Sequence, residues 1–208
     1  MHNSSFSYSN HSPVRAASKR KAGVITNSDI KPLRQGALDS LCGIYAIVNA
    51  FRLLSPELDI AASHHLFRFL LAPKHNCGPK PLEILRSGMT TRDNRKLIKL
   101  AKKFMKAEFG IGFKITKISR KQRHSLNTPD HLLHLIACAL LQDIVPIIGL
   151  EGRRSHWTII QSITASEIRL FDSNKITVLK RANCSIEEEP SRDCILPHEV
   201  TFIERITR

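Results

Sequence analysis

The fold is decided by residues 40–54, which read SLCGIYAIVNAFRLL. Only Asn49 and Arg52 are clearly polar, so a helix formed by this segment carries apolar side chains on nearly every side. Such a helix is buried at the centre of a domain. We therefore expect a central buried helix, capped at its start by Asp39 or Ser40, with the rest of the domain packed around it.

Apolar residues with helical spacing also recur elsewhere before residue 145. We expect further helical segments at 56–71, 82–86, 94–109 and 129–143. The segment 94–109 carries five lysines opposite its apolar face, with Asp93 as its N-cap and Gly110 as its end. Pro129 suits the first turn of the last helix, where its missing N–H is not needed.

Short β-branched runs separated by turn residues dominate the chain after Val145. We expect an antiparallel meander from 147–150, 157–163, 168–172 and 176–179, a further strand at 113–118, and an edge strand at 200–206. Helices followed by strands predict an α+β domain, with an N-terminal helical half packed on a C-terminal antiparallel β-sheet. We assign residues 29–208 to this single domain.

The net charge of +14 is local rather than uniform. Residues 1–28 carry four Lys/Arg, no acid and few large apolar groups, so we expect a disordered basic tail, with an organelle or secretion address as the alternative. Residues 92–123 carry twelve Lys/Arg and two acids. A solvated lysine face is the simplest interpretation of this patch, with nucleic acid, an anionic membrane or an acidic substrate as alternatives. Because Phe104 and Phe109 lie on the apolar side, stacking on bases is not favoured.

The sequence also predicts that several classes of protein and of site are absent. No apolar run reaches about 18 residues, so we expect no transmembrane segment, and the start of the chain lacks the apolar core of a Sec signal. The five dispersed cysteines form no CxxC pair, which argues against a disulfide framework and a cysteine zinc site. His131 and His134 have no acid at metal-ligand spacing, so we predict no metal and no cofactor. We expect a cytoplasmic location, with delivery or secretion by a non-Sec route as the alternative.

Four polar residues occupy positions suited to nucleophilic catalysis: Gln35, Cys42, His156 and Asp172. A thiol at a helix N-terminus is favoured as a thiolate, and a nearby histidine takes its proton. Two antiparallel strands joined by a turn would bring His156 and Asp172 into hydrogen-bonding reach, so that the carboxylate orients the imidazole. Asn174 is the alternative orienting residue. The other interpretation of Cys42 is an ordinary core residue.

The sequence resembles the papain-like cysteine peptidase superfamily in three segments, QGALDSLCGIYA from residue 35, HWTII from residue 156 and LFDS from residue 170. The acid before Cys-Gly and the final Asp resemble most closely the bacteriocin-processing, double-glycine peptidase branch, and less closely the Josephin deubiquitinases. The resemblance implies Cys42 as nucleophile, His156 as general base, Asp172 as orienting residue and Gln35 as oxyanion donor. Plant-type papains differ, because they have an aromatic residue after the nucleophile and Asn as the orienting residue.

The resemblance implies a cysteine hydrolase that cleaves a peptide or isopeptide bond of a protein or peptide substrate, with acidic substrates left open. Two alternatives remain. The same triad supports deamidation or acyl transfer by a delivered effector, and a degenerate peptidase scaffold would serve as a non-catalytic basic module that binds nucleic acid or an acidic protein. The oligomeric state does not follow from the sequence.

Overall fold

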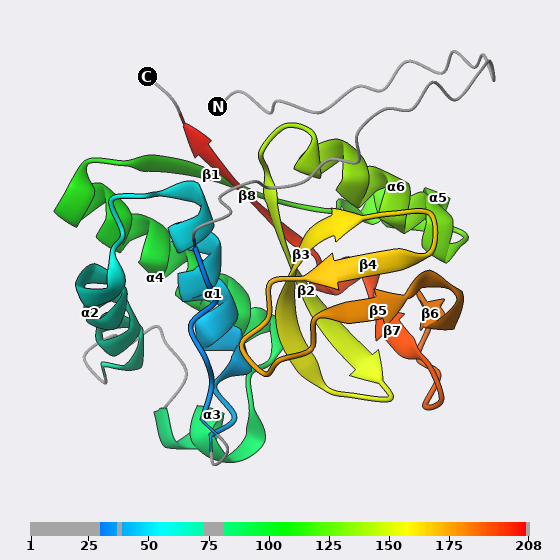
Figure 1. Cartoon of the computed structure of the whole chain (residues 1–208), viewed down its shortest axis with the longest axis horizontal. Helices are drawn as coiled ribbons and strands as arrows, with labels where there is room; N and C mark the ends of the chain where they lie inside the picture. The colour runs from blue at the N-terminus through cyan, green and yellow to red at the C-terminus, as the bar shows by residue number, and fades with distance from the viewer. Residues whose placement is uncertain (1–29, 37–38, 73–80, 207–208) are drawn as a thin grey trace.

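The structure is a computed structural model that describes residues 30–36, 39–72 and 81–206. It is a mixed α+β arrangement in which helices lie beside a mostly antiparallel sheet (Figure 1). The α-helices are α1 (Cys42–Leu54), α2 (Ile60–Leu71), α3 (Pro81–Ser87), α4 (Thr91–Phe109), α5 (Arg120–Ser125) and α6 (Pro129–Leu140). The strands are β1 (Gly112–Lys117), β2 (Val145–Gly152), β3 (His156–Ile163), β4 (Glu167–Leu170), β5 (Val178–Lys180), β6 (Cys184–Ser185), β7 (Asp193–Ile195) and β8 (Thr201–Ile206). Two 3₁₀ turns, η1 (Arg181–Asn183) and η2 (Pro197–Glu199), complete the elements. The predicted basic tail at 1–28 lies outside the described residues.

Helix α1 is the buried central helix that its composition predicts. It packs against α2 and α4 on one side and against β2 and β3 on the other, and only Tyr45 among its residues is not buried. Its predicted cap is wrong, because the N-cap residue is Leu41 and no side chain caps the helix. Asp39 instead accepts hydrogen bonds from the backbone N–H groups of Leu41 (3.0 Å) and Gly36 (3.0 Å), so it organises the loop before the helix.

The other predicted helices are present, with shifted ends. Helix α2 begins at Ile60 rather than residue 56, because the Asp59 side chain caps it. Helix α4 begins three residues earlier than predicted, and its N-cap is Thr90 rather than Asp93. Gly110 ends α4, as predicted, and it adopts the left-handed conformation there. The sequence analysis missed α5, whose capping box joins Ser119 and Gln122 at its first turn.

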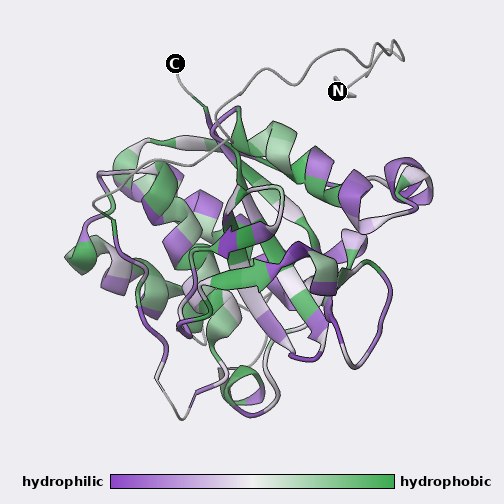
Figure 2. Ribbon diagram, turned by 45° about the vertical axis from the view of Figure 1, so that its right-hand side comes forward, coloured by the Kyte–Doolittle hydropathy of each residue, from purple (hydrophilic) through white to green (hydrophobic). Residues whose placement is uncertain are grey.

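The strand order is β1-β8-β2-β3-β4-β5; outside this order, β7 pairs with β2, and β6 pairs with β7. Strands β2 to β5 form the predicted antiparallel meander, whereas β6 pairs with β7 in parallel. The prediction of β8 as an edge strand is wrong, because it lies between β1 and β2 and buries Phe202 and Ile203. Figure 2 shows hydrophobic residues along the central strands and alternating hydrophobic and hydrophilic positions on the helices.

The described residues contain neither a disulfide nor a membrane-spanning helix. The four cysteines there, Cys42, Cys138, Cys184 and Cys194, are all free. No helix among these residues combines the length and the hydrophobicity needed to cross a bilayer. The fifth cysteine, Cys77, falls in the undescribed segment 73–80.

Gly152 ends β2 and begins the turn that leads into β3. Its φ is +79°, and an added Cβ would lie 2.4 Å from the Glu189 carbonyl oxygen and 2.6 Å from that of Arg192. Because backbone atoms cannot move aside cheaply, we expect Gly152→Ala to lower the free energy of unfolding by about 3 kcal/mol. Gly110→Ala is the control, since its φ is similar and nothing lies within 4 Å; we expect a loss of about 1 kcal/mol there. Equal losses in urea denaturation of the two variants would contradict this account.

Candidate active site

Cys42 is the first residue of α1, and its side chain is 9 % exposed. The first backbone N–H groups of a helix have no intrahelical acceptor and create a partial positive charge. In α1 no side chain caps these groups, and no acidic residue lies in the first turn. The thiol therefore lies where the helix favours negative charge and where backbone donors are free of side-chain caps.

His156 is the first residue of β3. We predicted that Asp172 ends the following strand, but this buried residue lies two positions beyond the end of β4. The β3–β4 hairpin still brings them together. The N–H of Phe171 donates to the Ile159 carbonyl (2.9 Å), and continuing this register places Asp172 beside the residue two positions after His156. Residues two apart on a strand share a face. As predicted, the side chains meet: Nε2 of His156 lies 2.6 Å from Oδ2 of Asp172.

The second carboxylate oxygen of Asp172 fixes the loop after β4. Oδ1 accepts hydrogen bonds from the backbone N–H groups of Asn174 (2.7 Å) and Ile176 (3.0 Å). Asn174 thus supports the site through its backbone, and the side chain that contacts the imidazole is that of Asp172. Burial alone would raise the pKa of Asp172, but the hydrogen bond and charge of His156 outweigh it and hold this pKa below its ordinary value.

The imidazole of His156 also interacts with the thiol of Cys42. Because Nε2 contacts Asp172, Nδ1 is the ring nitrogen left for the thiol. Burial of the ring, which is 7 % exposed, would lower its pKa, but the hydrogen bonds and charges of Asp172 and Cys42 raise it to about 9. The structure therefore brings thiol, imidazole and carboxylate together in one buried site.

Gln35 is linked to the loop of Asp172 through its backbone, whereas its side chain makes a different contact. Its backbone N–H donates to the Ser173 carbonyl (3.1 Å), which ties it to the loop that holds Asp172. Its side-chain Nε2 donates to the Asp39 carbonyl, a contact that the sequence analysis did not predict. An amide nitrogen carries two hydrogens, so one of them remains for another acceptor.

Asn49, which the sequence analysis left without a role, positions the segment that carries Gln35. Its Oδ1 accepts from the Leu33 N–H (2.8 Å) and its Nδ2 donates to the Leu33 carbonyl (3.3 Å). Nη1 of Arg52 donates to the Lys31 carbonyl (2.8 Å). The sequence held a signal for these roles, because Asn49 and Arg52 are the two clearly polar residues of an otherwise apolar helix.

Met89 covers Gly43, the residue after Cys42, and no sequence signal pointed to it. The indole Nε1 of Trp157 donates to the Met89 carbonyl (2.8 Å) and fixes the segment before α4. A Cβ added to Gly43 would lie 2.0 Å from Cε of Met89 and 3.3 Å from Cδ1 of Trp157. Glycine at position 43 thus lets both side chains pack directly against the start of α1.

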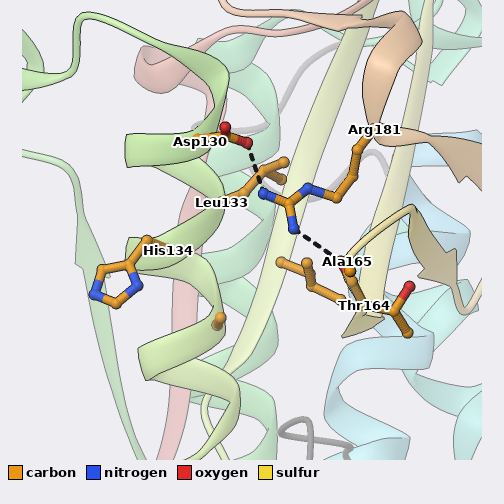
Figure 3. A pocket seen from close by; sticks show the side chains of 8 residues that line it. Asp130, Leu133, His134, Thr164, Ala165 and Arg181 are labelled. Carbon is orange, nitrogen blue, oxygen red and sulfur yellow. Dashed lines mark hydrogen bonds and ion pairs between the residues drawn. The ribbon is translucent and has the colours of Figure 1, made fainter. Parts of the chain in front are cut away.

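A pocket of about 290 Å³ lies away from these residues, at the turn between β3 and β4 and beside α6 (Figure 3). Its charged groups already pair, since Nη2 of Arg181 lies 2.6 Å from Oδ1 of Asp130 and Nη1 donates to the Thr164 carbonyl. His134 lines it, and Nε2 of this residue is 3.7 Å from Sγ of Cys138. Across the described residues, no group of three or more His, Cys, Asp or Glu side chains is arranged to hold a metal ion.

Chemically, the Cys42–His156–Asp172 arrangement suits the removal of a thiol proton by an oriented imidazole and attack of the sulfur on a carbonyl carbon. Comparison of the sequence with protein families gives no match, and comparison with curated proteins gives none.

Proposed function

We propose that this chain is a papain-like cysteine hydrolase that cleaves a peptide or isopeptide bond. One observation carries the proposal: in a buried site, the imidazole of His156 is hydrogen-bonded to Asp172 and also interacts with the thiol of Cys42. A cysteine that merely fills space in the core needs no oriented imidazole at its sulfur. The mixed α+β fold, with Cys42 on a helix and His156 on the sheet, supports the same proposal.

The first half of the reaction forms an acyl-enzyme. The Cys42 thiolate attacks the carbonyl carbon of the scissile bond, and the carbonyl π electrons move to oxygen. The backbone N–H of Cys42 and the second hydrogen on Nε2 of Gln35 are the donors that we assign to this oxyanion. As the C–N bond breaks, the His156 imidazolium gives its proton to the leaving amine, which leaves a thioester on Cys42.

The second half hydrolyses the thioester. His156 takes a proton from a water molecule, and the resulting hydroxide adds to the thioester carbon. The C–S bond then breaks, the carboxylic acid product leaves, and Cys42 with His156 returns to the starting pair. Through both halves Asp172 holds the ring so that Nδ1 faces the sulfur.

The rate of cleavage has a predictable dependence on pH. The imidazolium of His156 is the proton donor for the leaving amine, and its interactions with Asp172 and Cys42 raise its pKa to about 9 despite burial of the ring. We therefore expect kcat/KM to fall as the pH rises through about 9, where this proton is lost. The measurement is a pH–rate profile on a cleaved peptide, and a high-pH limb with a midpoint near 6.5 would contradict the raised pKa of His156.

The proposal is tested with an electrophilic peptide probe, such as a peptide acyloxymethyl ketone, followed by intact-mass and peptide-mapping measurements. We expect one adduct, on Cys42, that His156→Gln prevents. A peptide library then separates the reactions: new fragments indicate hydrolysis, whereas a mass gain of about one dalton without fragments indicates deamidation. Labelling at another cysteine in place of Cys42, or fragments that persist in Cys42→Ala, would overturn the proposal.

A further inference from the structure

The exposed face of α4 concentrates positive charge in one narrow band. At 3.6 residues per turn, its seven cations fall within an arc of about 120° around the helix axis. These residues, called the α4 basic face below, are Arg92, Arg95, Lys96, Lys99, Lys102, Lys103 and Lys106. The two acids of the helix, Asp93 and Glu108, lie outside that arc. The band therefore has a single sign of charge along its whole length.

Most of these cations form no ion pair within the described residues. Lys99, Lys102 and Lys103 are exposed, and within the described residues none of them forms an ion pair with a carboxylate. Nζ of Lys106 donates to the Gly110 carbonyl (3.3 Å), and Arg95 donates to the His198 carbonyl; among the described residues neither cation pairs with a carboxylate. Like charges this close repel one another, and an external polyanion would relieve that repulsion.

The spacing of the cations suits a nucleic-acid backbone. From Arg92 to Lys106 the helix rises about 21 Å at 1.5 Å per residue, so the seven cations lie on average about 3.5 Å apart along the axis. One strand of a duplex carries a charge every 3.4 Å or so along its axis. The α4 basic face is thus a straight ridge with about the charge density of one phosphate strand.

The packing of α4 argues against two other classes of anionic partner, membranes and single-stranded nucleic acid. An interfacial membrane helix inserts apolar side chains into the lipid. In α4, Leu97, Ile98 and Met105 are buried in the protein core and cannot do so. Single-stranded nucleic acid is held by stacking on exposed aromatic rings, whereas Phe104 is buried and packs against Phe69. A duplex bound through its phosphates requires neither insertion nor stacking.

We propose that the α4 basic face binds the phosphate backbone of duplex nucleic acid without reading its sequence. This binding does not depend on the proposed hydrolase activity, since it needs neither Cys42 nor His156. Its signature is a steep loss of affinity with salt, because each phosphate contact releases counterions.

The test measures binding of a fluorescein-labelled DNA duplex of mixed sequence to the full chain, by anisotropy over a range of salt concentrations. We expect the triple variant Lys99→Gln/Lys103→Gln/Lys106→Gln to bind at least about tenfold more weakly and to reduce the slope of log K against log salt by about three. Because all three residues are exposed, thermal unfolding should show an intact fold. Cys42→Ala should bind as tightly as the unmodified chain.

The matched control removes the same charge elsewhere, with Lys117→Gln/Lys121→Gln/Arg123→Gln in β1 and α5. We expect this variant to keep most of the affinity and most of the salt slope. Equal losses in the two triple variants would show that binding follows net charge, and would overturn the proposal. It would also fail if no duplex is bound at low salt, or if vesicles rich in phosphatidylserine are bound in place of the duplex.

Discussion

His156→Gln is expected to lower kcat/KM for peptide hydrolysis by about 10⁵- to 10⁶-fold while the protein stays folded. Removing the base from a catalytic unit of this kind has an effect of that size. The glutamine amide can still donate a hydrogen bond to the buried Asp172, so that the carboxylate is not left without a partner. It cannot accept the thiol proton at neutral pH, so only the chemistry should be lost.

The measurement is single-turnover cleavage of the best peptide from the library, together with thermal unfolding. His134→Gln is the matched control, because His134 also contacts a cysteine, Cys138, but lies on α6. We expect this control to keep its full rate. A folded His156→Gln variant within tenfold of the unmodified rate would show that the imidazole is not the base.

Asp172→Asn is expected to lower kcat/KM by about 10⁴-fold with little change in fold. The amide oxygen can replace Oδ1 as acceptor for the N–H groups of Asn174 and Ile176, which keeps the loop in place. The NH₂ group then points at His156, and Nε2 must act as acceptor instead of donor. The ring proton therefore moves to Nδ1, the nitrogen that should receive the thiol proton, and the wrong tautomer accounts for the loss.

This variant also changes the pH profile. Asp172 is a principal cause of the raised pKa of His156, so we expect the high-pH limb of kcat/KM to move to lower pH in Asp172→Asn. Asp130→Asn provides the control, since Asp130 is exposed and pairs with Arg181 away from the site. An unchanged rate and an unchanged limb in Asp172→Asn would mean that the carboxylate has no part in orienting the ring.

Local patterns were enough to predict much of the fold. An apolar segment with two polar residues predicted the burial of α1, and spacings of three and four predicted α4. The contact between His156 and Asp172 followed from the expected hairpin, because the start of one antiparallel strand lies near the end of the next. The proximity of His156 to Cys42 joins distant parts of the chain, so no local pattern specifies it; the chemistry of a thiol–imidazole pair and the family resemblance both suggested it.

The errors share a physical cause, which is that tertiary contacts decide between local options. Asp39 and Asp93 were both plausible N-caps, but Asp39 is used by the backbone of its own loop and Thr90 caps α4 instead. The burial of β8 between β1 and β2 depends on a pairing that its own residues do not specify. Likewise, nothing near Gln35 in the sequence shows that its amide reaches the Asp39 carbonyl.

The most direct test of the central claim is the rate at which iodoacetamide alkylates each cysteine at neutral pH, followed by peptide mapping. Cys138 is the stringent reference, because it is more exposed than Cys42 and itself contacts an imidazole. We predict that Cys42 reacts faster than Cys138 despite its burial, and that His156→Gln removes this advantage. If Cys42 reacts no faster than Cys138, the sulfur at the start of α1 is not an activated nucleophile, and the proposed hydrolase mechanism is wrong.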